Sequence, residues 1–462
     1  MYKLLWGRKD KAIHWSLWGK LGIHRVQTNG NNFLPCVFYA QKCKLVNLGV
    51  IFKLNLKFTP KMYTLLCKGG PFMIKRKVAE KLVQVSKQVP VVTVIGPRQS
   101  GKTTLVKECF PEYNYVNLED PFTRALATED YRGFFASYKE PLIIDEVQRV
   151  PELLSAVQVM VDEDRERNGR FILTGSHQST LQKEISQSLA GRTSIVTLLP
   201  LSMDELAEDG RLGKLSANKL LIQGFMPELY RENSRESRVY YRDYLNTYVE
   251  KDLREMLEVK NLDKFLRFLT LLAGRVGQVV NLSSMSGDVG VSSATLSQWL
   301  SVLEASYIVY KLQPYFSNIS KRHTKSPKIY FTEIGLASYL LGIETENHAN
   351  RDPLRGNLFE NLIVSEILKS RLNENKTPQL FYMRTEKGIE VDLIAKEENA
   401  LYPIEIKTSM TPNRSFSKNL LSFVDAEENA KNPKIIYTGQ SYPQFNGVEY
   451  VNFKDTKNYQ MF

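Results

Sequence analysis

The 462-residue sequence has few cysteines, no long apolar run and, over most of its length, almost no net charge. Its four cysteines show no paired spacing, which argues against a disulfide framework or a zinc site and indicates a reducing compartment. No run of about 18 uninterrupted apolar residues appears, so we expect no membrane partner. These absences and the length predict a soluble, cytoplasmic chain with about three domains.

The net charge of +12 is concentrated at one end of the chain. Residues 1–72 contain 12 of the 62 Lys and Arg residues and one acid, Asp10, so they carry +11 and residues 73–462 carry +1. Three of the four tryptophans also lie in this segment, which shows no sustained periodicity. The composition predicts a poorly structured basic N-terminal extension, with folding starting near Met73. A nucleic-acid-binding arm is the alternative.

A glycine-rich loop, residues 96–103, lies between a β-branched strand and a predicted helix. In the spacing G-x-x-x-x-G-K-T, backbone N–H groups and a helix N-terminus surround phosphates, and glycine avoids the obstruction that a Cβ would cause. Lys102 would neutralise phosphate oxygens and Thr103 would bind Mg²⁺, so the loop predicts ATP and Mg²⁺ as cofactors. The predicted nucleotide-binding residues are Gly96, Pro97, Arg98, Gln99, Ser100, Gly101, Lys102, Thr103, Thr104, Asp145 and Ser176.

Two further polar clusters each follow a short buried strand. These strands are expected at residues 142–144 and 171–173. Short apolar strands separated by helix-length segments predict a parallel sheet, whose carboxyl edge would hold all three clusters. Asp145 would hold Mg²⁺ and Glu146 would polarise the attacking water. Ser176, with Thr174 as second choice, would sense the γ-phosphate.

Two arginines are candidates for the positive charge that phosphoryl transfer needs in its transition state. Arg192, after Leu189-Ala190-Gly191, is the candidate arginine finger, with an ordinary surface arginine as the alternative. Arg98, inside the loop, is the weaker candidate. The sequence is compatible with an oligomer.

The region that follows predicts helices and then a strand pair. A helix at residues 294–304, a strand at 307–312 and a basic break at 321–325 before a strand at 328–331 resemble a winged helix-turn-helix, which predicts a nucleic-acid partner. Four upstream tyrosines recur at helical spacing, which indicates a packed core stripe more than a stacking platform for bases. They are Tyr240, Tyr241, Tyr244 and Tyr248.

The C-terminal part offers carboxylates on two neighbouring predicted strands. Asp392 and Glu405 would share a metal ion, and Lys407 lies on the same face as Glu405 because strand side chains repeat every two residues. Such a site can generate a hydroxide for phosphodiester hydrolysis. Glu360 or Glu366, on the preceding helix, would complete it. Acids at strand ends that pair with a solvated lysine are the alternative.

The motifs from Met73 onward resemble a prokaryotic family of AAA-type ATPases with a C-terminal domain of uncharacterised function. The resemblance rests on the loop and on the following segments: Ile144-Asp145-Glu146-Val147-Gln148, Leu173-Thr174-Gly175-Ser176, Ser188-Leu189-Ala190-Gly191-Arg192, Gly224-Phe225-Met226-Pro227-Glu228, Phe359-Glu360-Asn361, and Glu390-Val391-Asp392 with Ile404-Glu405-Ile406-Lys407. It implies a PD-(D/E)XK nuclease-like C-terminal fold with Glu360, Asp392, Glu405 and Lys407 at the matching positions. Residues 1–72 take no part.

Together these observations predict an α/β multidomain chain. Its parts would be the extension (1–72), a P-loop ATPase domain with a parallel sheet and flanking helices (73–207), a helical and winged-helix-like region (208–330) and a nuclease-like domain (351–462). The expected function is ATP hydrolysis coupled to a nuclease-like domain that acts on nucleic acid. An ATP-switched binding module that does not cleave, and a nucleotide-binding protein that does not hydrolyse, are the alternatives.

Overall fold

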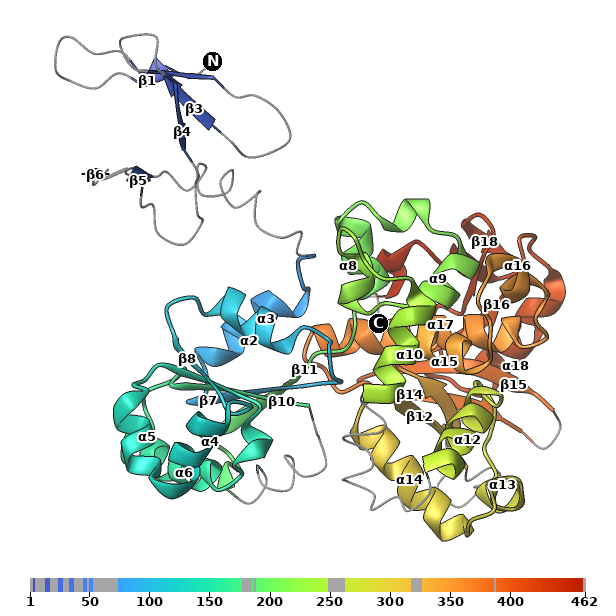
Figure 1. Ribbon diagram of the computed structural model, residues 1–462. Coiled ribbons are helices and arrows are strands. Elements are labelled where there is room, and N and C mark those ends of the chain that lie inside the picture. The colour runs from blue at the N-terminus through green and yellow to red at the C-terminus, as the bar shows by residue number, and fades with distance from the viewer. Residues whose placement is uncertain are drawn as a thin grey trace. The chain divides into compact units, whose positions relative to one another are not determined.

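The computed structural model divides into two compact units, Met1–Met73 and Ile74–Phe462 (Figure 1). Besides short strands between residues 3 and 52, the structure describes residues 74–176, 185, 188–247, 262–316, 326–385 and 388–459. In the first unit the described strands form an antiparallel sheet of order β1-β2-β3-β4 and a β5–β6 pair. They are β1 (Lys3–Leu4), β2 (Ile13–Ser16), β3 (His24–Gln27), β4 (Phe33–Cys36), β5 (Leu45–Asn47) and β6 (Val50–Phe52). The rest of the predicted extension lies outside the described residues.

The second unit begins with a five-stranded parallel sheet of order β11-β7-β10-β9-β8. Its strands are β7 (Val91–Ile95), β8 (Asn114–Asn117), β9 (Leu142–Asp145), β10 (Phe171–Gly175) and β11 (Thr193–Thr197). The three central strands are buried along their whole length and are rich in Val, Ile and Leu. Such strands are typical of parallel sheets covered on both faces. The predicted parallel α/β sheet is confirmed.

Helices cover both faces of this sheet because successive strand side chains point to opposite sides. Val92 and Val94 pack with α2 and α3 on one face, and Val91 and Ile95 pack with α4, α5 and α6 on the other. The helices are α2 (Val78–Ser86), α3 (Lys102–Cys109), α4 (Pro121–Glu129), α5 (Tyr131–Ser137) and α6 (Leu153–Glu163).

The strand order brings three chain segments to one edge of the sheet. Strand β10 lies between β7 and β9, with Gly175 opposite Ile95 and Leu173 opposite Ile144. The carboxyl ends of these strands therefore meet, and residues 96–103 follow β7 at that edge. This is where parallel α/β sheets bind ligands.

Helices and a strand pair make up the next region. The helices are α8 (Met203–Glu208), α9 (Ala217–Gln223), α10 (Ser237–Tyr244), α12 (Leu262–Ala273), α13 (Leu282–Val289) and α14 (Ser293–Ala305). Between α13 and α14, Gly290 is left-handed (φ 74°) and the Ser292 hydroxyl caps α14 by accepting the N–H of Thr295. Strands β12 (Val309–Pro314) and β13 (Lys328–Phe331) pair antiparallel, and Val279 forms a bridge with Lys328.

Two features predicted for this region lie partly outside the described residues. Tyr240, Tyr241 and Tyr244 are buried in a large shared core, as expected for packing residues. Tyr248 and the basic break at 321–325 lie in segments that the structure does not describe.

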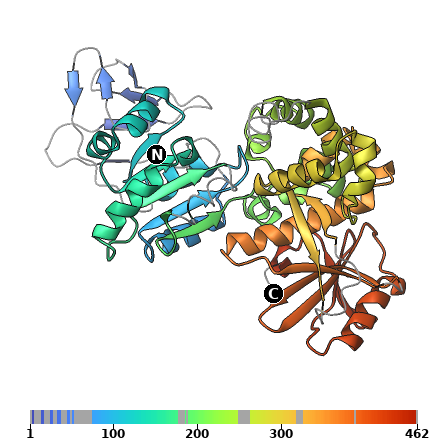
Figure 2. The same cartoon turned by 90° about the horizontal axis from the view of Figure 1, so that it is seen from below.

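The C-terminal part is a mixed eight-stranded sheet of order β13-β12-β14-β15-β16-β17-β19-β18. Its further strands are β14 (Leu380–Arg384), β15 (Glu390–Glu397), β16 (Ala400–Lys407), β17 (Lys434–Tyr437), β18 (Tyr442–Phe445) and β19 (Val448–Asn452). Helix α17 (Arg355–Asn373) packs on one face, where Ile363 shares a core with Ile404. Helix α18 (Lys418–Ala426) packs on the other, where Phe423 meets Ile435 (Figure 2).

The predicted division between 208–330 and 351–462 does not coincide with a break in the structure. Strand β12 pairs in parallel with β14, with Gln313 opposite Phe381, so β12 and β13 extend the C-terminal sheet. This pairing satisfies backbone groups that an edge strand would leave exposed. Helices α15 (Ile334–Leu340) and α16 (Glu346–Arg351) connect the two parts. Among the described helices, none is long and apolar enough to cross a membrane.

Candidate functional site

The phosphate loop, residues 96–103, packs so closely against its surroundings that glycine is required. A Cβ on Gly96 would lie 2.1 Å from the carbonyl oxygen of Leu198. Gly101, which precedes α3, has a φ of 96°, and Gln99 also has a positive φ of 61°. The loop therefore turns tightly into the N-terminus of α3, which is the backbone arrangement that binds phosphate.

Lys102, the first residue of α3, is buried against this loop. Its Nζ donates hydrogen bonds to the carbonyl oxygens of Gly96 (3.0 Å) and Pro97 (2.9 Å). Burial lowers the pKa of Lys102 to about 8, although the charges of Glu146 and Asp145 oppose the shift. Because a buried cation is stabilised by an opposite charge, Lys102 fits an anionic phosphate ligand.

Asp145, at the end of β9, is surrounded by hydroxyl groups. Thr103 Oγ1 donates to Asp145 Oδ2 at 2.9 Å, and Tyr115 OH donates to the same oxygen at 2.7 Å. The Thr174 hydroxyl also bonds this carboxylate. The Thr103 hydroxyl and the Asp145 carboxylate thus lie side by side, although one comes from the first turn of α3 and the other from the end of β9. Such oxygen donors fit Mg²⁺, as the sequence predicted for this pair.

Glu146 adopts a left-handed backbone conformation (φ 58°), which is uncommon outside glycine and places it at the turn after β9. Its backbone N–H donates to Thr174 Oγ1 at 3.2 Å, and Ser176 Oγ donates to its carboxylate at 3.3 Å. Gln148 Nε2 bonds both Ser176 and Glu146. Each sensor candidate therefore contacts a different carboxylate of the site, Thr174 at Asp145 and Ser176 at Glu146.

Arg192 lies at the opposite end of the strands from the phosphate loop. It precedes β11, where Thr193 lies opposite Val91, the first residue of β7, so a strand of about 16 Å separates it from the loop. Its guanidinium forms two 2.8 Å hydrogen bonds with the Asp162 carboxylate. Arg192 therefore does not reach the phosphate site of its own chain. Arg98 lies in the loop, where its positive charge repels that of Lys102 and helps to lower the pKa of that lysine.

In the C-terminal sheet, Asp392 lies at an irregularity of β15. Between the pairs made by Phe381 and Met383, two residues of β15 lie opposite one residue of β14. Such a bulge redirects a side chain, and bulges are frequent next to active sites. On the other side, Asp392 Oδ2 accepts the backbone N–H of Ile406 in β16 at 2.8 Å. Asp392 is thus fixed against the strand that carries Glu405.

Glu405 and Lys407 lie on one face of β16, two residues apart. Lys407 Nζ forms ion pairs with Asp392 (3.4 Å) and Glu405. Burial, and then the charge of Asp392, raise the pKa of Glu405 to about 8. Glu405 Oε2 is buried and has no hydrogen-bond partner among the described residues. An unpartnered carboxylate oxygen beside a second carboxylate fits a hard divalent cation.

Glu360 of α17 belongs to the same cluster. Its Oε1 accepts hydrogen bonds from Tyr330 OH (2.6 Å) and Lys328 Nζ (3.1 Å). Burial, and then the charge of Asp392, raise the pKa of Glu360 to about 7. Glu366, the alternative position, instead contacts the first residue of α8. Within the part of the chain that the structure describes, no three His, Cys, Asp or Glu side chains are gathered as a ready-made metal site.

Curated proteins from mycobacteria match most of this chain. An uncharacterized protein of Mycobacterium tuberculosis is 32% identical over 347 residues, which cover 74% of this chain and 76% of that protein. A Mycobacterium bovis protein gives the same values. This chain belongs to their family. An uncharacterized protein of Haemophilus influenzae is 23% identical over 418 residues, which cover 83% of this chain and 98% of the relative.

Three family models match this member of the family. An AAA domain matches residues 88–207, a domain of unknown function (DUF8612) matches 215–347, and another (DUF4143) matches 355–455. The chain therefore carries an AAA-type P-loop ATPase domain. Among solved structures, the Walker-type ATPase of Pyrococcus abyssi is 15% identical and covers 58% of this chain and 96% of its own, with a TM-score of 0.40.

Sequence reasoning missed residues that reach both clusters from other elements. Tyr115 contacts Asp145 from an edge strand, and Tyr240 OH donates to Gln99 Oε1 in the phosphate loop at 2.6 Å. Lys328 and Tyr330 contact Glu360 from β13. The last pair had a usable signal, because a lysine and a tyrosine two residues apart share one face of a strand that was predicted correctly.

Proposed function

We propose that this protein binds and hydrolyses ATP at the AAA domain and uses that cycle to control a nuclease-like C-terminal site that acts on nucleic acid. The observation that carries the ATPase part is the contact between Thr103 of the phosphate loop and Asp145 of β9. In this proposal Lys102 binds the β- and γ-phosphates, Thr103 and Asp145 hold Mg²⁺, and Glu146 orients the attacking water.

A buried polar network supports coupling between the AAA domain and α17. Arg76 NH1 donates to the carbonyl oxygen of Ser100 in the phosphate loop at 2.7 Å, and Arg76 Nε donates to Glu205 of α8 at 3.0 Å. Glu205 and Ser202 form a capping box at the start of α8. A shift of the phosphate loop would therefore act on the N-terminus of α8 through one buried guanidinium.

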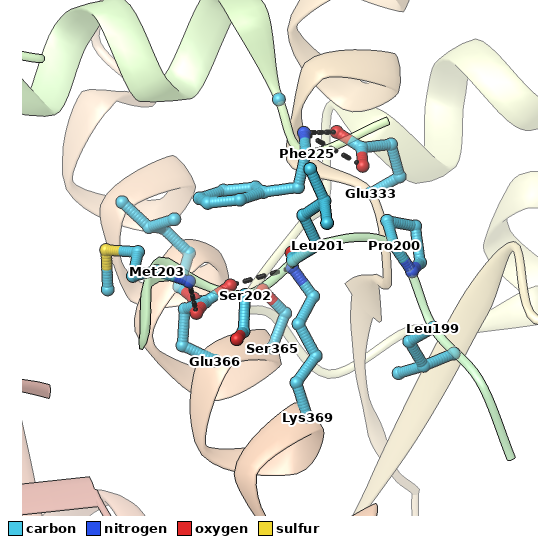
Figure 3. A network of polar contacts seen from close by, with 12 residues as sticks. Leu199, Pro200, Leu201, Ser202, Met203, Phe225, Glu333, Ser365, Glu366 and Lys369 are labelled. Atoms are coloured by element: carbon cyan, nitrogen blue, oxygen red, sulfur yellow. Dashed lines mark hydrogen bonds and ion pairs between the residues drawn. The ribbon is translucent and has the colours of Figure 1, made fainter. Parts of the chain in front are cut away.

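The same network continues from α8 into α17 (Figure 3). The backbone N–H of Met203 donates to Glu366, and Lys369 Nζ bonds Glu366 Oε1 (2.7 Å) and the carbonyl oxygen of Leu201 (2.9 Å). Both charged side chains are buried, so displacing either one would be costly. Helix α17 also carries Glu360, which joins the C-terminal cluster.

At the C-terminal cluster, Asp392 and Glu405 would hold one divalent cation. A Mg²⁺ ion bound there supplies Lewis-acid activation of a water for phosphodiester hydrolysis. Asp392 is fixed by accepting the Ile406 N–H, and Lys407, which pairs with Asp392, would neutralise negative charge on a phosphate. The observation that favours a cation at this cluster is the Oε2 atom of Glu405, which has no hydrogen-bond partner in the described part of the chain.

The winged-helix-like unit would read the nucleic acid. Helix α14 exposes Ser297, Gln298 and Ser301, whose side chains can hydrogen-bond base edges. Neither α13 nor α14 contains Lys or Arg. Phosphate attraction by these helices is therefore weak, and a strong salt-dependent affinity for any duplex is not expected from them.

Cleavage assays test the nuclease part of the proposal. The full chain would be incubated with labelled DNA or RNA and Mg²⁺ or Mn²⁺, and we expect cleavage that Asp392→Ala and Lys407→Ala each abolish. Glu449→Ala, which removes an acid that pairs with Lys434 away from the cluster, is the matched control and should leave cleavage intact. Absence of cleavage, or cleavage that survives Asp392→Ala, would contradict it.

A specific observation favours a second function, an ATP-switched binding module that does not cleave. Lysine side chains already pair with the carboxylates of the C-terminal cluster, as in a structural ion-pair network. This function predicts two results. Lys102→Ala abolishes ATP turnover, and the wild type binds nucleic acid or a protein partner but never cuts it. The third alternative is a protein that binds ATP without hydrolysing it. This alternative is excluded if the wild type consumes ATP and Glu146→Gln retains it.

A further inference from the structure

We propose that Lys328 acts as a built-in cation between Glu360 and Glu390, which restricts the C-terminal cluster to a single divalent ion at Asp392 and Glu405. This inference rests on the proposed metal-binding role of the cluster. It makes Lys328 a positioning residue and gives the site four carboxylates but only one position for a metal.

The contacts of Lys328 are those of a fixed counter-ion. Its Nζ lies 3.1 Å from Glu360 Oε1 and 2.7 Å from Glu390 Oε1, and its side chain is only 3% exposed. The ring of Tyr382 lies beneath it, with the centroid 5.4 Å from Nζ. Two carboxylates and an aromatic face therefore surround the ammonium.

Glu360 is also bound from a second direction. Tyr330, two residues after Lys328 on β13, donates its hydroxyl to the same Oε1 atom at 2.6 Å. That oxygen thus already accepts two hydrogen bonds, which is as many as its lone pairs favour. A metal ion could bind it only by displacing a donor that β13 holds in place.

The two lysines of the cluster differ in how easily a metal could displace them. Lys407 is 33% exposed and ends its strand, so its long side chain can swing toward solvent. Lys328 is buried, and leaving its position would strand an uncompensated charge inside the protein. An incoming divalent cation would therefore replace Lys407 near Asp392 and leave Lys328 in place.

The hydrogen bonds of the carboxylate oxygens also favour a metal position between Asp392 and Glu405. Glu405 Oε2 has no partner among the described residues, and its side chain is only 7% exposed. Glu405 lies beside Asp392 through their shared contact with Lys407. The cluster therefore offers ligand oxygens on the Asp392–Glu405 side, while the Glu360–Glu390 side already holds the buried ammonium of Lys328.

Titration with Mn²⁺ tests this assignment without reference to activity. The paramagnetic resonance signal of unbound Mn²⁺ would be recorded on the full chain in the Asp145→Asn background, which removes the carboxylate proposed to bind a cation beside the phosphate loop. In mildly alkaline buffer we expect one bound Mn²⁺ per chain, lost in Asp392→Asn. Lys328→Met should bind a second Mn²⁺, or the first about tenfold more tightly, because one positive charge has been removed nearby.

Two further variants complete the experiment. Lys328→Arg keeps the charge and should bind one Mn²⁺ like the parent, and adding Glu360→Gln to Lys328→Met should remove the second ion. A Lys328→Met protein that binds one Mn²⁺ with unchanged affinity would overturn the inference. A second result would also overturn the inference and needs no Lys328 variant. In that result the Asp145→Asn parent binds two Mn²⁺ ions, and Glu360→Gln removes one of them. If Asp392→Asn leaves Mn²⁺ binding unchanged, this result contradicts the proposed metal-dependent function itself.

Discussion

Lys102 is a buried cation whose hydrogen bonds go to two backbone carbonyl oxygens. Burial lowers the pKa of Lys102 to about 8, from the value of 10.5 for an ordinary lysine. The folded protein therefore releases this proton at a lower pH than the unfolded chain does. Between about pH 8 and pH 10.5 the unfolded chain binds more protons, so the contribution of Lys102 to the free energy of unfolding rises with pH, by at most about 1.4 kcal/mol per pH unit.

Replacing this lysine isolates its contribution. The Lys102→Met variant lacks the titrating group, so its free energy of unfolding minus that of the wild type should fall as the pH rises from about 8 to 10. Urea titrations at several pH values measure the difference. A difference that stays constant across this range would show that Lys102 keeps an ordinary pKa in the folded protein.

Gly96 and Gly191 are a matched pair with positive φ, 153° and 74°. A Cβ at Gly96 would meet the Leu198 carbonyl at 2.1 Å, whereas no atom of the described residues lies within 4 Å of one at Gly191. We expect Gly96→Ala to lower the free energy of unfolding by about 1–3 kcal/mol and to abolish ATP binding, because the loop must move. Gly191→Ala should cost about 1 kcal/mol of backbone strain and keep ATP binding. Equal loss of ATP binding in both variants would contradict the interpretation that the close approach of Leu198 makes glycine necessary at position 96.

Helix α10 contacts the phosphate loop through one hydroxyl, since Tyr240 OH donates to Gln99 at 2.6 Å. Its neighbour Tyr241 is equally buried but bonds Gln223 and Glu333 instead. Tyr240→Phe should weaken ATP binding about three- to tenfold by loosening Gln99, whereas Tyr241→Phe should destabilise the fold and leave the affinity unchanged. Calorimetric titration with ATP measures both. The same loss in both variants would mean that α10 acts only through general stability.

The central strands could be predicted because their apolar runs are continuous, and the edge strands could not. The β-branched strand expected just before the glycine-rich loop is β7, and the strands expected at 142–144 and 171–173 match β9 and β10 within two residues. Strands β8 and β11, at the two edges, consist largely of Asn, Tyr, Thr and Ser, so their sequence resembles a loop. The placement of β10 between β7 and β9 is a long-range pairing that periodicity does not reveal.

The carboxylates of the C-terminal cluster could be predicted from the sequence, with Glu360 named from its helix and from the family resemblance, but the contact of Lys328 could not. Asp392 and Glu405 lie on strands joined by a short turn, so their proximity follows from hairpin geometry. Lys328 reaches Glu360 from a strand 32 residues earlier in the chain. That contact depends on β12 pairing with β14, which joins two regions that the sequence analysis had divided.

At the scale of the whole second unit, Arg76 is the residue that links the phosphate loop to α8. Arg76→Met should therefore remove the response of α17 to ATP, measured as the change in amide hydrogen exchange around Glu360 and Glu366. We expect the wild type to show such a change, because α17 contacts the start of α8 through Glu366.

Arg170 provides the control for Arg76. It is also a buried arginine that pairs with a carboxylate, Glu140, and bonds a backbone carbonyl, but it lies away from α8. Arg76→Met should lose about 3–5 kcal/mol of stability, because it leaves the buried Glu205 carboxylate without its arginine. Arg170→Met should also lose stability, but less, because Arg167 still lies 3.5 Å from Glu140. Only Arg76→Met should lose the ATP response. Loss of the response in both would attribute it to stability, and its retention in Arg76→Met would exclude this route.

We propose that ATP turnover at the AAA domain is linked to nucleic acid. The most direct measurement is the rate of ATP hydrolysis by the full chain with and without DNA or RNA, beside Lys102→Ala. We expect ATP hydrolysis whose rate changes several-fold when nucleic acid is added and which Lys102→Ala abolishes. Hydrolysis that nucleic acid leaves unchanged, or no hydrolysis sensitive to Lys102→Ala, would contradict it.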